Sequence, residues 1–121
     1  MIWARSGRSA RNWTRCVRGD IYRLRAPRNA TGHEQKGARY AVVLQADALA
    51  PLSTWIIAPT STRAPGRPFR PEIEIDGTKT RVVLDQLTAV DRDRLGDAAG
   101  RVDPHELADI DTGLRGVLGL F

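Results

Sequence analysis

The sequence predicts a mainly β domain whose short antiparallel strands curl into a small, strongly bent barrel, followed by one C-terminal helix. Three observations lead to this fold class. Short alternating or apolar segments recur between turn-forming residues, as strands do. Two long polar loops separate groups of these segments, and the only helical apolar pattern of the domain lies near its C-terminus. Strands of this kind in a chain of 121 residues share one modest core and usually close into a barrel.

The first half of the domain contains three predicted strands. Residues 17–24 alternate apolar and polar side chains, which is typical of a half-buried strand. Residues 40–45 (YAVVLQ) form a continuous apolar run, as in a strand buried on both faces, and residues 54–58 (TWIIA) form the third strand. A loop rich in Asn, Gly, Thr and charge at 28–37 and a short connection at 47–53 separate them.

The second half begins with a loop over residues 60–71, which holds three prolines and a glycine in the run RAPGRPFRP. Residues 72–75 (EIEI) alternate strictly, and Asp76-Gly77 is a strong signal for a tight hairpin turn. The chain is expected to return as a strand over 80–84 and to continue the sheet over 86–90.

A helix is predicted to start after Asp103. Asp103 is a good N-cap, Pro104 suits the first helical position, and Glu106 can complete a capping box. Gly113 and Gly116 are each expected to weaken this helix by roughly 1 kcal/mol relative to Ala. Its apolar stripe is predicted to consist of Leu107, Ile110, Leu114, Val117 and Leu118.

Net charge is +5 and is unevenly distributed along the chain. Residues 1–18 hold five arginines and no acid, whereas residues 82–121 hold four basic and eight acidic residues. We interpret residues 1–16 as a basic, disordered arm and residues 17–121 as the domain. The basic front and middle favour a polyanion-facing surface, although a solvated surface with no partner explains charge alone equally well.

Several protein classes are disfavoured by composition. Cys16 is the only cysteine, so no internal disulfide or Cys-rich metal site is expected. No apolar run approaches the roughly 18 residues of a membrane helix, and the N-terminus lacks the apolar centre of a secretory signal. The acids of residues 91–97 (DRDRLGD) alternate with arginine, which indicates a solvated, self-paired turn rather than a metal site. We therefore expect a cytoplasmic protein with no metal and no cofactor.

One segment could carry chemistry. Residues 32–39 (GHEQKGAR) form a Gly-flanked polar loop that ends on Arg39, at the mouth of an apolar strand, and Thr60 follows the third strand. A guanidinium and a hydroxyl suit RNA cleavage by the substrate's own 2′-hydroxyl, because both can stabilise charge on the phosphorane. Spacing alone leaves an alternative open, in which Arg39 forms a structural ion pair with Asp20 or Glu34 and Thr60 is a turn residue.

These residues also carry a family resemblance: the sequence resembles the MazF/PemK toxin ribonucleases of toxin–antitoxin pairs over about residues 17–120. The landmarks in order are residues 18–22 (RGDIY), 32–39, 59–61 (PTS), 85–87 (DQL), 90–91 (VD) and 94–95 (RL), followed by the helix over 104–120. The resemblance implies a dimeric, Src-homology-3-like barrel of the type shared by MazF, CcdB and PemK.

The implied activity is sequence-specific, metal-independent cleavage of single-stranded RNA, giving 2′,3′-cyclic phosphate and 5′-hydroxyl ends. Substrates in the family are mRNA and in some members rRNA or tRNA, and the antitoxin inserts an acidic, extended C-terminal segment along the RNA groove. The family's catalytic residues fall on Arg39 and Thr60. Residues implied to bind or orient substrate are Glu34, Gln35, Lys36, Ser61 and Gln86.

Two positions depart from the family pattern: His33 stands where Ser is usual, and Tyr40 replaces the proline that usually follows Arg39. Tyr40 restores a backbone N–H at the strand entry. Two other functions remain open at this point. One is a CcdB-like, non-enzymatic toxin that inhibits gyrase, and the other is a binding barrel without catalysis, because a fold does not fix function.

Overall fold

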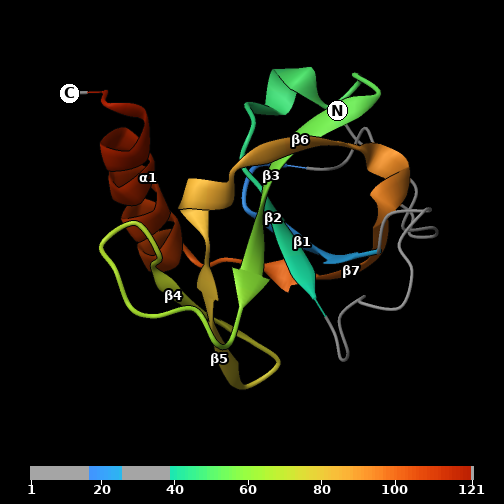
Figure 1. The fold of residues 1–121 in the computed structure, drawn as a ribbon. Coiled ribbons are helices and arrows are strands. Elements are labelled where there is room, and N and C mark those ends of the chain that lie inside the picture. The colour runs from blue at the N-terminus through green and yellow to red at the C-terminus, as the bar shows by residue number, and fades with distance from the viewer. Residues whose placement is uncertain (1–16, 26–38, 121) are drawn as a thin grey trace, which may run out of the picture.

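The computed structural model describes residues 17–25 and 39–120. This part of the chain contains one antiparallel sheet, curled on itself, and one C-terminal α-helix (Figure 1). The predicted fold class is therefore confirmed. In chain order the strands are β1 (Asp20–Leu24), β2 (Tyr40–Val43), β3 (Thr54–Ser61), β4 (Glu72–Ile75), β5 (Thr78–Val82), β6 (Thr88–Asp91) and β7 (Leu95–Arg101), and the helix is α1 (Pro104–Leu118).

Strand β3 organises the sheet because it changes partner along its length. The strand order is β4-β5-β3-β2-β1-β7, and β6 also pairs with β3. The first half of β3, from Thr54 to Ile57, pairs with β6, whereas Thr60 and Ser61 pair with Val82 and Arg81 of β5. The other edge of β3 pairs with β2. This change of partner bends the sheet, so that the hairpin β4–β5 folds over one of its faces (Figure 1).

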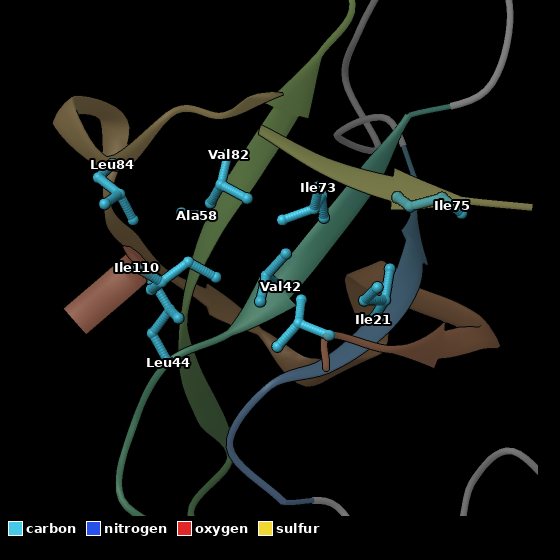
Figure 2. Packing of buried hydrophobic residues seen from close by; sticks show 10 residues of the cluster. Ile21, Val42, Leu44, Ala58, Ile73, Ile75, Val82, Leu84 and Ile110 are labelled. Atoms are coloured by element: carbon cyan, nitrogen blue, oxygen red, sulfur yellow. The ribbon is translucent and has the colours of Figure 1, made fainter. Parts of the chain in front are cut away.

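Two apolar cores lie on opposite faces of β2 and β3, as strand alternation requires. Val42 and Ala58 face the first core, which β4, β5 and α1 enclose. Figure 2 shows the labelled side chains of this core pointing toward one another between these elements. Val43 and Ile57 face the second core, together with Trp55. Each large aliphatic side chain buried here stabilises the fold by about 1.5–3 kcal/mol, which explains why YAVV has no polar position.

The β4–β5 hairpin forms as the Asp76-Gly77 signal predicts. Both turn residues have positive φ, 50° at Asp76 and 81° at Gly77. A two-residue turn of this kind needs positive φ at both positions, which Asp tolerates and Gly adopts without strain. The turn sets Ile75 opposite Thr78, so Ile73 and Ile75 both point into the first core.

Helix α1 starts with the predicted capping box. The Asp103 side chain accepts from the Glu106 N–H at 2.7 Å, and the Asp103 N–H donates to Glu106 at 2.9 Å. Gly113 has a role that propensity does not reveal, because a Cβ there would lie 2.6 Å from Leu84 Cδ1. A glycine thus allows close packing of α1 on the sheet. The predicted stripe is correct at Ile110, which is fully buried, and at Leu107, Leu114 and Val117, which are partly buried against the core, but Leu118 is 50% exposed.

Several predicted boundaries were wrong. The alternation over 17–24 includes a turn, so β1 starts only at Asp20, and β2 ends at Val43 rather than 45. The strand predicted at 80–84 is β5, Thr78–Val82, and a 3-10 turn at Leu84–Gln86 delays β6 to Thr88. The first two strands were predicted longer than backbone pairing supports, and the strand at 80–84 was placed two residues too late.

Two errors are larger. Residues 60–61 were assigned to a loop because prolines follow them, yet β3 continues to Ser61 and includes Pro59. The Pro59 carbonyl accepts from the Val83 N–H at 2.8 Å, so proline is accommodated where β3 changes partner. Residues 95–101 were not predicted as a strand, because LGDAAGR has little β propensity. They form β7 by pairing with β1.

Candidate RNA-cleavage site

The start of β2 and the end of β3 lie next to each other, on the lower side of the view in Figure 1. Ala41 pairs with Pro59 in the β2–β3 ladder. Continued by two residues, this antiparallel register sets Tyr40 opposite Thr60 and Arg39 opposite Ser61. The Thr60 hydroxyl donates to the Tyr40 carbonyl at 3.4 Å, which agrees with that continuation. The structure therefore brings Arg39, the last residue of the first segment singled out by the sequence, next to the end of β3.

Strand alternation places the two neighbouring hydroxyls on different faces of the sheet. Thr60 pairs with Val82 and shares its side of the sheet with Ala58, toward the first core. We call this the Thr60 face. Thr60 is only 4% exposed, and its hydroxyl is bonded to a backbone carbonyl. Its side chain is therefore turned toward the protein interior.

Ser61 lies on the opposite side, which we call the Ser61 face; Arg39 and Ala41 share it by alternation. Ser61 is half-buried, and its oxygen accepts from the Arg63 N–H at 3.2 Å. That bond leaves the hydroxyl proton available to a ligand. Arg39 and Ser61 thus share one face of the sheet, and Thr60 lies on the other.

The backbone holds Arg39 firmly at this position. Its carbonyl accepts from the Leu24 N–H at 2.9 Å, which extends the β1–β2 ladder by one residue. The alternative ion pair with Asp20 is not formed, since Asp20 binds Arg101 at 2.7 Å and accepts from the Val17 N–H at 2.9 Å. The other alternative partner, Glu34, lies outside the described residues.

Ser61 pairs with a basic residue and is followed by a basic connection. Arg81 is its partner on β5, and residues 62–71, which connect β3 to β4, carry Arg63, Arg67 and Arg70 and no acid. Such a concentration of guanidinium groups next to a donor hydroxyl suits a phosphate-bearing ligand. Sequence reasoning missed Arg81, although its position two residues after exposed Lys79 in an alternating strand was a usable signal.

Arg70 is fixed by a forked ion pair with Asp85. Its Nε donates to one carboxylate oxygen at 3.1 Å and its Nη2 to the other at 2.9 Å. The hydrogen bonds from Arg70 hold the pKa of the Asp85 carboxyl below its ordinary value, and the same contact raises the pKa of Arg70. This pair ties residues 62–71 to the 3-10 turn at Leu84–Gln86.

Of the remaining predicted residues, only Gln86 belongs to the part of the chain that the structure describes. Glu34, Gln35, Lys36 and His33 lie outside the described residues. Gln86 is exposed in the 3-10 turn between β5 and β6, opposite the middle of β3 rather than its end.

Tyr40, the departure from the family pattern, opens β2 and pairs with Arg23 of β1. The Arg23 guanidinium carbon lies 5.5 Å from the centre of the Tyr40 ring, within the range of a cation–π contact. The strand entry is therefore regular despite the loss of proline.

Among residues 17–25 and 39–120, no group of three His, Cys, Asp or Glu side chains is placed to hold a metal ion. The same residues include no helix long and apolar enough to cross a membrane.

The family is decided by comparison with known proteins. Residues 17–118 match the family described as the PemK-like, MazF-like toxin of type II toxin–antitoxin systems. The chain belongs to this family. A candidate toxin of Mycobacterium tuberculosis (strain ATCC 25618 / H37Rv), Rv3098A, is 38% identical over 105 residues, which cover 86% of this chain and 98% of that protein. The resemblance that the sequence suggested is thereby confirmed, and the protein is a toxin of a toxin–antitoxin system.

Solved structures of MazF proteins and of a mycobacterial endoribonuclease have the same fold as this chain. A MazE–MazF complex from Deinococcus radiodurans superimposes with a TM-score of 0.71 at 26% identity, covering 88% of this chain and 97% of that chain. MazF of the same organism gives 0.68 at 27% identity, with 86% and 96% covered. A mycobacterial endoribonuclease in complex with its cognate antitoxin gives 0.71 at 23% identity, with 88% and 97% covered, and shows the common fold.

Proposed function

We propose that this toxin is a metal-independent endoribonuclease that cleaves single-stranded RNA at short sequences and thereby inhibits translation and growth. The observation that carries the proposal is the pairing of Arg39 and Ser61 on one face, with Arg81 adjacent. Family membership supports it, as do the neighbours named endoribonuclease and MazF. We assign to Ser61 the hydroxyl role that the resemblance implied for Thr60, because the Thr60 hydroxyl is buried and bonded to a carbonyl.

In the proposed reaction the 2′-oxygen of the RNA attacks the adjacent phosphorus, and the bond from phosphorus to the 5′-oxygen breaks. The 2′-hydroxyl gives up its proton as it attacks and the leaving 5′-oxygen takes one up, so the products are a 2′,3′-cyclic phosphate and a 5′-hydroxyl with no net change in protons. No metal is required, because the nucleophile belongs to the substrate. The Arg39 fork neutralises charge on the non-bridging oxygens, and the Ser61 hydroxyl donates one more hydrogen bond as that charge develops.

The proposed partners follow from the family. Solved neighbours include complexes with MazE and with a cognate antitoxin. We propose that an acidic, extended antitoxin segment occupies the basic surface around Ser61 and competes with RNA there. We also propose that the toxin is a homodimer, that Glu34, Gln35, Lys36 and Gln86 bind or orient RNA, and that residues 1–16 form an arm outside the domain.

The test is cleavage of a long single-stranded RNA by the purified toxin in EDTA, with mapping of the new ends. A fixed short motif at the cut sites, cyclic phosphate ends and loss of cutting after 2′-deoxy substitution at the cleaved nucleotide are expected. Intact RNA with inhibition of gyrase would instead identify a CcdB-like toxin. Binding of RNA without cleavage or gyrase inhibition would identify a binding module.

A further inference from the structure

Arg81 lies next to Ser61 in the sheet and has no role in the reaction proposed above. It pairs directly with Ser61 in the β3–β5 ladder, so the two side chains share the Ser61 face. Adjacent strands are about 4.8 Å apart, which places Arg39 and Arg81 on the two sides of Ser61. About a third of the Arg81 side chain is exposed (32%). The register therefore places an arginine on each side of Ser61.

The Arg81 guanidinium is held in one orientation by backbone contacts. Its Nη1 donates to the Arg70 carbonyl at 2.9 Å. Gly66 packs against it so closely that a Cβ at that position would lie 3.2 Å from Nη2 and 3.3 Å from Cζ. The carboxylate of Glu72 is 3.7 Å from Nη2, a loose contact. Of the five N–H donors of the guanidinium, these contacts within the described residues engage few, and the others can bind phosphate oxygens.

The carbonyl that holds Arg81 is itself fixed. It belongs to Arg70, whose side chain forms the forked ion pair with Asp85. Arg70 also donates to the Pro65 carbonyl at 3.4 Å, a second contact of its side chain within the β3–β4 connection. Asp85 therefore influences Arg81 without touching it, through the position of the Arg70 backbone.

We propose that Arg81 binds an RNA phosphate beside the scissile one and that the Arg70–Asp85 pair positions it. This inference rests on the proposed ribonuclease function. Arg81 is a substrate-binding residue in this scheme, and Asp85 is a positioning residue. A rigid planar fork is suited to the role, whereas a flexible lysine would supply only charge.

The experiment measures the affinity of the full-length toxin for a fluorescein-labelled, single-stranded RNA that carries 2′-deoxy substitution at its cleavage site. Affinities are taken over a series of KCl concentrations, and kcat and KM are measured on the all-RNA form. The variants are Arg81→Met, Arg81→Lys and Asp85→Asn. Lys79→Met is the matched control, because Lys79 lies on the same strand and face, carries the same charge and is 72% exposed.

Arg81→Met is expected to weaken binding about tenfold, the size of one lost charged hydrogen bond. The slope of log K against log salt should fall by about 0.7, the value for one phosphate contact on a single strand. Arg81→Lys should recover the slope but only part of the affinity. Lys79→Met should change affinity less than threefold.

Asp85→Asn distinguishes positioning from general electrostatics by the sign of its effect. It removes a negative charge near the basic surface, so electrostatics alone would strengthen RNA binding, whereas misplacement of Arg81 weakens it. Weaker binding by a variant that remains folded at the assay temperature supports the proposal, and tighter binding overturns the role of Asp85.

The failure of this inference can be separated from failure of the proposed function. If the wild type cleaves RNA and Arg81→Met binds it with unchanged affinity and salt slope, only the role of Arg81 is overturned. If the wild type cleaves no RNA, the proposed function fails. Binding of a random-sequence RNA by the same variants then decides whether Arg81 contacts phosphate. If Arg81→Met does not fold, Arg81→Lys is used in its place. An affinity for RNA equal to that of the wild type would then overturn the role of Arg81, and a weaker affinity with an unchanged salt slope would support it.

Discussion

Thr60 and Ser61 are consecutive hydroxyl residues at the end of β3, and they occupy different environments. Thr60 faces the core formed with Ile73, Val82 and Leu84, is almost fully buried and bonds to a carbonyl. Ser61 is half-buried and is flanked by Arg39 and Arg81. One face of the strand thus packs against the core, and the other is the face that we propose binds a phosphate. Alternation along a strand separates these two tasks within two residues.

The largest difference between the faces is expected for Arg39→Ala on the Ser61 face. Loss of the guanidinium that neutralises the phosphorane should reduce kcat by about 1,000-fold or more, the range seen when an arginine that stabilises a phosphoryl transition state is removed. Cleavage rate and thermal unfolding are measured together, with Arg115→Ala on the exposed face of α1 as the control. Near wild-type turnover in Arg39→Ala would remove this residue from the mechanism.

The second prediction compares the two hydroxyls directly. Ser61→Ala should lower kcat by about 100-fold with little change in stability, since it removes one donor to developing charge. Thr60→Val should leave kcat within a few-fold and lower the free energy of unfolding by about 1 kcal/mol, because it removes one buried hydrogen bond. The opposite outcome, a large kcat loss only in Thr60→Val, would return the catalytic role to Thr60.

The third prediction concerns packing on the Thr60 face. Gly113→Ala should destabilise the protein by about 1 kcal/mol, because the clash with Leu84 outweighs the gain in helix propensity. Gly116→Ala meets nothing within 4 Å and should stabilise by up to about 1 kcal/mol. Urea unfolding measures both, and cleavage rates should be unchanged in each. Equal effects of the two substitutions would contradict the close approach of α1 to Leu84.

The smallest effect is expected at Asp85, which links residues 62–71 to the rest of the fold. Its folded-state pKa is lowered by Arg70, so its contribution to stability is present above the unfolded-state pKa of about 4. That contribution is lost as the pH falls through the folded-state pKa. The difference in unfolding free energy between wild type and Asp85→Asn should therefore shrink in acid. A difference that is constant from pH 7 to pH 2 would mean that Asp85 is not ionised in the pair.

The sequence predicted local interactions correctly and missed those between residues far apart in the chain. The Asp76-Gly77 hairpin and the Asp103–Glu106 capping box were predicted correctly, because each depends on residues within one turn of the chain. Strand β7 was missed, since Leu95–Arg101 becomes a strand only by pairing with β1, more than 70 residues earlier. The loop boundary at residue 60 was wrong for the same reason: β5 pairs with Thr60 and Ser61 and keeps them in the strand.

For the site, the sequence by itself indicated the family, singled out Arg39 as a candidate catalytic residue and showed the basic character of the segments around it. It supplied both hydroxyls but not the choice between them. That choice belongs to the tertiary structure, because the side that a residue faces depends on where its strand ends and which partner it pairs with. The register that sets Arg39, Ser61 and Arg81 in one row is formed by three strands, and only the folded sheet brings them together.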